Sequence, residues 1–211
     1  MKKIAITTLG EARHDTPLPT GDASEPLIPA VVQWPGGKVP ENLMLFEKAG
    51  PRRKLFFNPA ETRAAIVTCG GLCPGLNNVI RSITHELNFG YGVTSVIGIR
   101  GGYRGLDPSR GKPPIELTEN FVSDIHKDGG TVLGTSRGPV DVSIAVDFLI
   151  EQKVDILFTV GGDGTQRGGN ALYQEAEKRG RPLAVVGIPK TIDNDVSHVS
   201  RTFGFGTAVD E

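Results

Sequence analysis

The sequence predicts an α/β fold: a three-layer, doubly wound domain with a mainly parallel central sheet. From residue 63 onward, short apolar runs rich in β-branched residues alternate with longer segments whose apolar residues recur at helical spacing. The short runs lack the polar alternation of half-exposed strands, so they fit strands that helices cover on both faces. Glycine, 28 of 211 residues, clusters where several of these runs end. Ligands of such sheets bind at the carboxyl ends of the strands, which is where these glycines fall.

Each element follows from its local pattern. The run Ala64–Thr68 ends at a glycine pair, and Leu76, Val79 and Ile80 then repeat at helical intervals. β-branched residues mark the next strand, and Pro189 ends the last one. We therefore expect strands at residues 64–68, 93–99, 155–160 and 183–188, helices at 76–87, 143–153 and 168–179, a shorter helix near 121–126, and a glycine-rich loop at 101–105.

Residues 1–60 differ from the rest of the chain. They are rich in proline and show no sustained hydrophobic periodicity. We predict that they form an N-terminal extension or wrapping arm, with an independent functional module as the alternative. Residues 61–211 are predicted to form the α/β domain.

Composition argues against several classes of protein. The formal net charge is −1, with 38% hydrophobic and 22% charged residues, which is unlike the basic footprint of a nucleic-acid-binding protein. No stretch approaches 18 apolar residues, and the apolar run after the basic N-terminus is too short for a signal peptide, so no membrane partner is expected. Cys69 and Cys73 lack a second pair of ligands for zinc. We expect them to be reduced thiols in a cytoplasmic protein.

The first glycine-rich loop, Gly70–Gly75, leads from a predicted strand into a predicted helix. Backbone N–H groups of glycines and of a helix N-terminus attract anions, so this loop is a candidate phosphate site. Its spacing matches neither the dinucleotide-binding G-x-G-x-x-G pattern nor the Walker pattern. A tight strand-to-helix turn without a ligand explains it equally well.

The second loop, Gly161–Thr165, places Asp163 among glycines at the end of another apolar strand. A carboxylate beside phosphates repels them unless a hard cation lies between, and Mg²⁺ takes one or two carboxylates together with phosphate oxygens. Asp163 is therefore a candidate ligand of Mg²⁺, and the flanking N–H groups are candidate phosphate contacts. An ordinary Asp-Gly turn is the alternative.

A third segment, Pro189–Asp195, follows the last buried strand and carries two carboxylates. Phosphoryl transfer to an alcohol benefits from a carboxylate that accepts the hydroxyl proton, a role open to Asp193 or Asp195. Thr191 is a candidate to orient the phosphate or the hydroxyl, and Lys190 offers a positive charge to phosphate. A solvated loop with an Asx-turn would account for the same residues.

The fourth candidate is the segment Gly134–Gly138. Arg137 lies there between small residues, and a guanidinium in such a place can bind a transferring phosphoryl group through two hydrogen bonds. An ordinary surface arginine would show the same local sequence.

Together, the four segments resemble the phosphofructokinase family over residues 63–211, in both their order and their spacing. The long N-terminal arm and the Gly-Leu-Cys-Pro-Gly sequence resemble the plant and trypanosomatid branch more than the short bacterial allosteric branch. The resemblance implies a phosphofructokinase-like N-terminal domain and ATP-dependent phosphorylation of fructose 6-phosphate to fructose 1,6-bisphosphate in glycolysis. The segments that carry it are Gly70–Asn77, Gly134–Gly138, Gly161–Thr165 and Pro189–Asp195.

The resemblance also implies a role for individual residues. Asp193 would be the base that accepts the proton of the sugar's 1-hydroxyl, Arg137 would stabilise the moving phosphoryl group, and Lys190 would belong to the catalytic set. Asp163 would hold Mg²⁺. The implied sugar contacts are Thr191, Ile192 and Asp193, and the implied ATP contacts are Gly71, Tyr103, Arg137, Gly138, Gly162, Asp163, Gly164 and Thr165.

The phosphoryl donor depends on the residue after the metal-binding aspartate. In the family, a glycine there leaves space for the α-phosphate of a nucleotide, whereas an aspartate goes with pyrophosphate. Gly164 therefore favours ATP, although Lys190 stands where pyrophosphate-dependent enzymes also carry lysine. Plant and trypanosomatid ATP enzymes resemble this combination. ATP is thus the expected donor, and a pyrophosphate-dependent fructose-6-phosphate 1-phosphotransferase is the alternative.

Members of the family also have parts that this chain lacks. A second domain supplies the residues that grip the sugar 6-phosphate, so the chain is expected to be truncated before that domain. An inactive phosphate-binding fragment is therefore an alternative function. A relative of NAD kinases or lipid kinases, which share only Gly161–Thr165, is another. The family forms dimers and tetramers, which implies a homo-oligomer in the full-length form.

Overall fold

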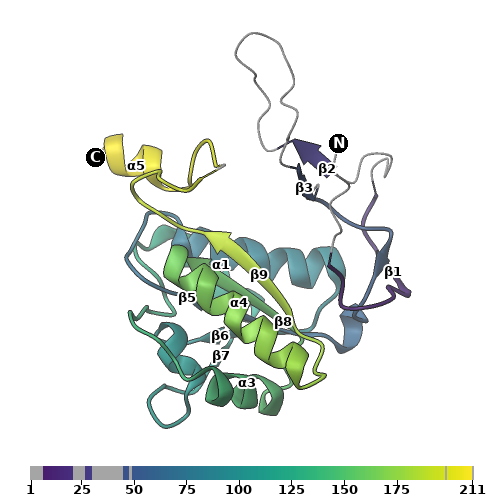
Figure 1. Ribbon diagram of the computed structural model, residues 1–211. Helices are drawn as coiled ribbons and strands as arrows, with labels where there is room; N and C mark the ends of the chain where they lie inside the picture. Colours follow the sequence, from purple (N-terminus) through teal and green to yellow (C-terminus); the bar gives the residue numbers. More distant parts are fainter. Residues whose placement is uncertain (1–6, 21–26, 30–44, 48, 198, 211) are drawn as a thin grey trace. The chain divides into compact units, whose positions relative to one another are not determined.

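By its internal contacts, the chain divides into two units, Met1–Phe56 and Phe57–Glu211. All the predicted site residues lie in the second unit. The computed structural model (Figure 1) describes residues 7–20, 27–29, 45–47, 49–197 and 199–210.

The described part of the first unit contains two pairs of short antiparallel strands. β1 (His14–Asp15) pairs with β4 (Lys54–Leu55), and β2 (Leu27–Pro29) pairs with β3 (Leu45–Glu47). In the first pair, the Lys54 ammonium lies 2.7 Å from the Asp15 carboxylate and lowers the pKa of Asp15. Strands of two or three residues are too short to show a repeating pattern, which is why the sequence predicts only an irregular extension here.

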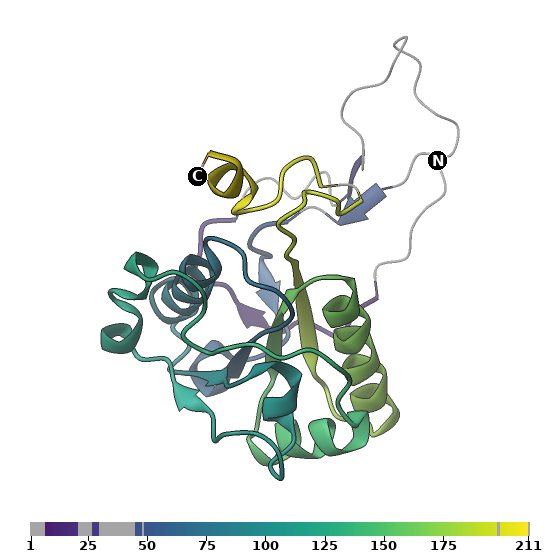
Figure 2. The same ribbon diagram turned by 90° about the vertical axis from the view of Figure 1, so that its left-hand side faces the viewer.

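A five-stranded sheet forms the centre of the second unit (Figures 1 and 2). Its strands are β5 (Arg63–Thr68), β6 (Ser95–Ile99), β7 (Ile115–Glu116), β8 (Ile156–Gly161) and β9 (Ala184–Pro189). Their order across the sheet is β7-β6-β5-β8-β9. All neighbours are parallel except β7, which joins β6 antiparallel at one edge. The predicted mainly parallel sheet is confirmed.

Helices cover both faces of this sheet. The longer ones are α1 (Leu76–His85), which continues into the π-helical turn η3 (Glu86–Tyr91), α3 (Val142–Glu151) and α4 (Asp163–Lys178). α1 lies on one face, and α3 and α4 lie on the other (Figures 1 and 2). None of the helices in the described ranges is long and apolar enough to cross a membrane. The shorter helical elements are η2 (Pro59–Glu61), η4 (Gly102–Leu106), α2 (Glu119–Val122), η5 (Ile125–Lys127) and α5 (Phe205–Asp210).

The strand residues alternate between two hydrophobic cores. In β5, Ala64 and Ile66 belong to the core that includes α1, whereas Ala65 and Val67 belong to the core that includes α3 and α4. All four side chains are fully buried. A central strand covered on both faces needs apolar residues at consecutive positions, which is why β5 reads as a continuous apolar run.

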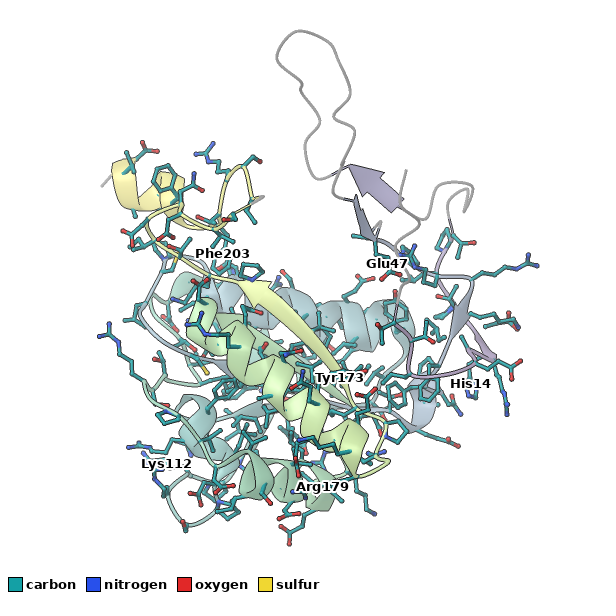
Figure 3. All side chains as sticks on the ribbon, in the orientation of Figure 1. His14, Glu47, Lys112, Tyr173, Arg179 and Phe203 are labelled. Carbon is teal, nitrogen blue, oxygen red and sulfur yellow. The ribbon has the colours of Figure 1, made fainter. Side chains whose placement is uncertain are left out.

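Arg179, labelled in Figure 3, connects the two helices of one face. It follows the last residue of α4 and donates to the Glu175 carboxylate of the same helix (2.9 Å). It also donates to the Asp147 carboxylate and the Ser143 hydroxyl of α3. These bonds join α3 and α4 at the end of α4 that lies away from the carboxyl ends of the strands.

Some predicted boundaries are wrong in detail. α4 begins at Asp163 rather than at residue 168, because Gly162 is its N-cap and its first turns contain glycines that the sequence assigns to a loop. The predicted loop at 101–105 is largely the 3₁₀ turn η4. The region near 121–126 holds two short helical turns, α2 and η5, in place of one helix. The predicted strands differ from the observed ones by at most two residues at either end.

The sheet has a natural ligand position between two of its strands. The chain leaves β5 toward α1 on one face and leaves β8 toward α4 on the other. β5 and β8 are neighbours, so the segments that leave them diverge at their carboxyl ends. Crevices at such points are where ligands bind in open α/β sheets. The segments after β5 and β8 are two of the four predicted to bind phosphate or metal.

Candidate functional site

A pocket of about 510 Å³ lies at the carboxyl ends of β5 and β8. Its walls come from the loop after β5, from η4, from the segment that leads into α3, from the first turns of α4 and from the residue after β9. The four predicted segments, which are spread over more than half of the chain, therefore all contribute to this region or adjoin it.

The loop after β5 is shaped by its glycines. Gly70 and Gly75 have φ angles of +81° and +93°, which residues with a side chain rarely adopt. The Cys69 N–H donates to the Val160 carbonyl oxygen (2.9 Å), which extends the pairing of β5 with β8. Gly75 is the N-cap of α1. The chain thus passes from strand to helix along the pocket, which Gly70 and Gly71 line.

The segment Gly134–Gly138 is attached to the same strand. The Thr68 hydroxyl donates to the first carbonyl oxygen of this segment (2.9 Å), and the Gly70 N–H donates to the Ser136 carbonyl oxygen (3.1 Å). These bonds hold Arg137 in the wall of the pocket, beside the loop that follows β5. Its position suits a guanidinium that binds phosphate.

The N-terminus of α4 forms another wall, with Gly162 as the N-cap and Asp163 as the first helical residue. Because α4 is 16 residues long, its aligned peptide dipoles place partial positive charge at this end. Gly164 lines the pocket, and a side-chain carbon added there would meet no atom within 4 Å. The fold therefore does not require glycine at position 164, and a larger residue would occupy open space beside the pocket.

Tyr103, in η4, packs against the first turns of α4. Its hydroxyl donates to the Thr165 carbonyl oxygen (2.6 Å), and its ring fills the space beside Gly168, where an added side-chain carbon would lie 2.5 Å from a ring atom. Tyr103 is 6% exposed, and burial raises its pKa. It lines the pocket and also fixes the position of α4.

Lys190 is a largely buried residue in the pocket wall. It is 6% exposed, and its N–H donates to the Gly161 carbonyl oxygen (3.0 Å), which continues the pairing of β9 with β8. Among the residues that the structure describes, no carboxylate forms an ion pair with it. A positive charge in a pocket wall attracts anions when no carboxylate neutralises it, so Lys190 favours an anionic ligand in this pocket.

Both cysteines are buried close to this ammonium. Burial raises the pKa of Cys69 to about 11, although the charge of Lys190 acts in the opposite direction. Burial also raises the pKa of Cys73, whose thiol donates to the Phe203 carbonyl oxygen (3.1 Å). Both thiols are therefore protonated at neutral pH, and neither is suited to act as a nucleophile.

The segment after β9 is organised around Thr191. The Thr191 hydroxyl donates to the Asp195 carboxylate (2.6 Å) and accepts from the Asp193 N–H (3.0 Å). The Asp193 side chain is exposed, and within the described part of the chain its carboxylate has no hydrogen bond or ion pair. Asp195 therefore holds the loop, while the Asp193 carboxylate is available to accept a proton.

Asp163 is the predicted metal ligand. It is exposed at the start of α4, between two residues that line the pocket. The described ranges contain no group of three or more His, Cys, Asp or Glu side chains that could hold a metal ion. A single carboxylate suits Mg²⁺ when phosphate and water oxygens complete its coordination. The residues present thus fit an ion that binds together with a phosphate ligand.

Most of the residues predicted to contact ATP line the pocket. Asp163 and the segment Thr191–Asp193 are not part of its lining, although each directly adjoins a lining residue in the chain, and Ile192 is exposed. The predicted residues that line it are Gly71, Tyr103, Arg137, Gly138, Gly162, Gly164, Thr165 and Lys190.

One wall of the pocket is missing from the sequence prediction. Pro139, Val140 and Val142 follow the Arg137 segment and give the pocket an apolar side, and Gly168 borders it from α4. A signal for this wall exists in the sequence, because apolar residues flank Asp141, the N-cap of α3, directly after the glycine-rich segment. Nothing in that pattern alone says that it faces a ligand.

Comparisons with known proteins show the family to which the chain belongs. A protein-family model described as Phosphofructokinase matches residues 63–211. Similar curated proteins include the ATP-dependent 6-phosphofructokinases of Trypanosoma cruzi, 56% identical over 168 residues, and of Entamoeba histolytica, 54% identical over 163 residues. These alignments cover 80% and 77% of this chain but 35% and 37% of the relatives. The chain thus spans about a third of the length of the curated relatives it matches.

Solved structures show the same fold. Phosphofructokinase of Pichia pastoris in the T-state matches with a TM-score of 0.60 and 28% identity, over 68% of this chain and 17% of that chain. Phosphofructokinase of Saccharomyces cerevisiae matches with a TM-score of 0.61 and 26% identity, over 71% of this chain and 23% of that chain. Since the family model covers well over half of the sequence, the chain belongs to the phosphofructokinase family.

Proposed function

We propose that the complete translation product containing this chain transfers the γ-phosphoryl group of ATP to the 1-hydroxyl of fructose 6-phosphate. The products are fructose 1,6-bisphosphate and ADP. Relatives of the chain are named ATP-dependent 6-phosphofructokinases. The observation that carries the proposal is the pocket itself, where the ammonium of Lys190, the guanidinium of Arg137 and the N-terminus of α4 surround one space.

In the proposed reaction, the residues of this chain move one proton and stabilise negative charge. Asp193 accepts the proton of the 1-hydroxyl, and that oxygen attacks the γ-phosphorus while the bond to the β–γ bridging oxygen breaks. The electron pair of that bond leaves with ADP. Arg137, Lys190 and the first N–H groups of α4 stabilise the charge on the transferring group and on the departing ADP.

We assign Asp163 as the residue that holds Mg²⁺. The support is its free carboxylate at the start of α4, next to a pocket that suits phosphate. When bound, Mg²⁺ neutralises charge on the phosphate oxygens of the donor. The helix N-terminus favours a carboxylate at this place even without the ion, because negative charge there complements the helix dipole.

We assign the pocket to ATP rather than to pyrophosphate. Gly164 lines the pocket and has open space around it, so its lack of a side chain leaves room for a donor larger than pyrophosphate. The apolar wall of Pro139, Val140 and Val142 adds a surface that pyrophosphate does not need. The nucleotide contacts that we propose are Gly71, Tyr103, Arg137, Gly138, Gly162, Asp163, Gly164 and Thr165.

The acceptor side of the proposal rests on the segment after β9. Thr191, Ile192 and Asp193 are the proposed contacts to fructose 6-phosphate, and they directly follow Lys190.

We also propose that the complete product is a homo-oligomer, a dimer or a tetramer, which light scattering after size-exclusion chromatography would measure. A cytoplasmic location stays a prediction, and two plant relatives are named chloroplastic.

The proposal is tested with the purified complete translation product, ATP, Mg²⁺ and fructose 6-phosphate. We expect ADP release at about 1–100 s⁻¹, the usual range for kinases, with fructose 1,6-bisphosphate as the product. 1-Deoxyfructose 6-phosphate, which keeps the 6-phosphate but lacks the 1-hydroxyl, is the matched control and should give no turnover. A folded product that binds MgATP but leaves fructose 6-phosphate unchanged would contradict the proposal. Steady turnover by the 211-residue chain alone would refute the inactive-fragment alternative.

A further inference from the structure

The Gln166 side chain connects the carboxyl ends of β8 and β9. Gln166 lies in the first turn of α4, and its amide nitrogen donates to two backbone carbonyl oxygens. One belongs to Gly161, the last residue of β8 (2.9 Å), and the other to Ile188 in β9 (3.2 Å). The amide has two hydrogen atoms, so it can serve each acceptor with one. The side chain thus bridges a helix and two neighbouring strands.

These two bonds lie where the backbone pairing of the strands ends. Gly161 is paired with Pro189, which has no N–H to donate, and β8 then turns into α4. The Lys190 N–H supplies one more bond, to the same Gly161 carbonyl oxygen (3.0 Å). The Gln166 amide therefore reinforces the sheet at its last pair of residues, immediately before the two segments that carry the proposed chemistry.

The first turn of α4 lies close to two glycines of the strands. A side-chain carbon added at Gly187 would lie 2.0 Å from the Gln166 amide oxygen. A carbon added at Gly161 would lie 2.2 Å from the Thr165 hydroxyl oxygen. Glycine at position 161 therefore lets the first turn of α4 lie close to the end of β8, whereas a methyl group at position 187 would displace the end of the Gln166 side chain.

We propose that Gln166 is a positioning residue for phosphoryl transfer. The first turn of α4 contains Asp163 and Gly164, which are proposed to contact ATP and Mg²⁺. The Gln166 amide fixes this turn relative to the segment that begins at Lys190 and carries the base Asp193. This inference rests on the proposed function. A shift of about 1 Å in a catalytic group can lower turnover about 100-fold. Loss of the amide should therefore slow the reaction more than it weakens ATP binding.

Two substitutions remove the bonds in different ways. Gln166→Leu keeps a side chain of similar size without a donor. Gln166→Glu keeps the shape of the side chain but replaces the amide NH₂ group with a carboxylate oxygen. This oxygen cannot donate a hydrogen bond, so it and the two carbonyl oxygens repel one another. Gln174→Leu is the matched control, because Gln174 lies in the same helix, is exposed, and has a side chain that forms no hydrogen bond with another described residue.

The first measurement is hydrogen exchange of the Lys190 N–H in the 211-residue chain, followed by NMR without any substrate. We expect exchange to be about five- to tenfold faster in Gln166→Leu, because the strand ends lose a hydrogen-bonded connection and open more often. Gln166→Glu should accelerate it at least as much, and Gln174→Leu should leave it unchanged. Unchanged exchange in both Gln166 variants overturns the proposal, whatever the activity of the enzyme.

The second measurement is steady-state kinetics of the complete translation product. We expect kcat of Gln166→Leu to fall about 10- to 100-fold while KM for ATP stays within about twofold. A purely structural role would instead lower the folded fraction, so kcat is expressed per folded molecule from circular dichroism. Equal kcat in Gln166→Leu and Gln174→Leu overturns the proposal.

Two outcomes separate this inference from the proposed function. If the wild-type product transfers no phosphoryl group, the proposed function fails, and the exchange measurement alone decides whether Gln166 holds the strand ends together. If Gln166→Leu does not fold, Gly187→Ala replaces it, since the added methyl group displaces the amide without changing Gln166. The same acceleration of exchange and loss of kcat are then expected, and their absence overturns the proposal.

Discussion

Asp193 and Asp195 are two residues apart, but hydrogen bonding gives them different roles. Asp195 accepts a hydrogen bond from the Thr191 hydroxyl, while the Asp193 carboxylate has no partner among the described residues. The local sequence pattern leaves either one as the base, and the family resemblance implies Asp193. The two contacts of the Thr191 hydroxyl, with Asp195 and with the Asp193 N–H, explain why the proposed function assigns the base to Asp193.

Replacement of the proposed base should affect the chemical step alone. In the complete translation product, we expect Asp193→Ser to lower kcat by about 10²–10⁴, because general base catalysis is lost. The Kd for MgATP, measured by calorimetry, should stay unchanged. Asp195→Asn is the control, since an amide oxygen can still accept the Thr191 hydrogen bond, and its effect should be smaller. Equal activity of Asp193→Ser and the wild type would remove Asp193 as the base.

Gly164 is the residue at which the choice of donor can be tested. Because a side chain there would enter open space beside the pocket, Gly164→Asp should leave the fold intact. Its carboxylate should repel and obstruct the nucleotide, so that kcat/KM for ATP falls far more than kcat/KM for pyrophosphate. Gly129→Asp is a control at another glycine with open surroundings. Proportional losses with both donors would contradict the assignment of ATP.

At the scale of elements, α3 depends on its N-cap. The Asp141 carboxylate accepts hydrogen bonds from the N–H groups of Ser143 (2.9 Å) and Ile144 (3.1 Å), and the next residue of the helix, Val142, lines the pocket. We expect Asp141→Ala to lower the free energy of unfolding by about 1 kcal/mol, since two N–H groups lose their acceptor. Urea unfolding of the 211-residue chain measures this.

The companion variant Asp141→Asn separates capping from charge. Asparagine caps helices about as well as aspartate, so this variant should keep nearly the full stability. If Asn and Ala destabilise the chain equally, the charge of Asp141 rather than its hydrogen bonds supports α3.

The elements differ in how far the sequence predicts them. β5 and β8 are continuous apolar runs because both of their faces are covered, and this pattern is readable without a structure. α4 is harder, because Gly162 and Gly164 suggest a loop, although Gly162 is the N-cap of the helix and Gly164 lies in its first turn. Gly168, farther along the helix, allows a close contact with the Tyr103 ring. Local patterns do not reveal such long-range contacts.

Prediction of the candidate site from the sequence has the same limit. Motifs predict Arg137, Gly162, Gly164 and Lys190, and the pocket brings these residues together. The bridging role of Gln166 is absent from any pattern, because it depends on carbonyl oxygens that come within reach only when β8 and β9 pair. Chemistry-bearing residues are thus readable from sequence, while the residues that position them are not.

At the scale of the whole domain, the buried thiol beside the pocket links stability to pH. The pKa of Cys69 rises from 9.0 to about 11 on burial, so the folded state holds this proton more tightly than the unfolded state. This stabilisation is fully present below pH 9 and is lost as the pH rises through about 11. Burial raises the pKa of Tyr103 above its ordinary value of 10.0 as well, so its contribution to stability also begins to decline above pH 10.0.

We therefore expect the free energy of unfolding to decline between pH 9 and 11. Cys69→Ala should show a shallower decline, because the group that titrates is gone. Urea unfolding of the 211-residue chain at a series of pH values, under reducing conditions, measures both. An equally steep decline in Cys69→Ala would show that another group controls the alkaline transition.

The spread of the pocket along the chain has a consequence for protein synthesis. Cys69 and Gly71 emerge from the ribosome early, but Lys190 follows β9, the last strand of the sheet. A nascent domain without β9 lacks this cation and the strand that holds it, so nucleotide has no complete site to bind and cannot stabilise early intermediates. The two hydrophobic cores must hold the growing chain together without help from the ligand that the finished domain is proposed to bind.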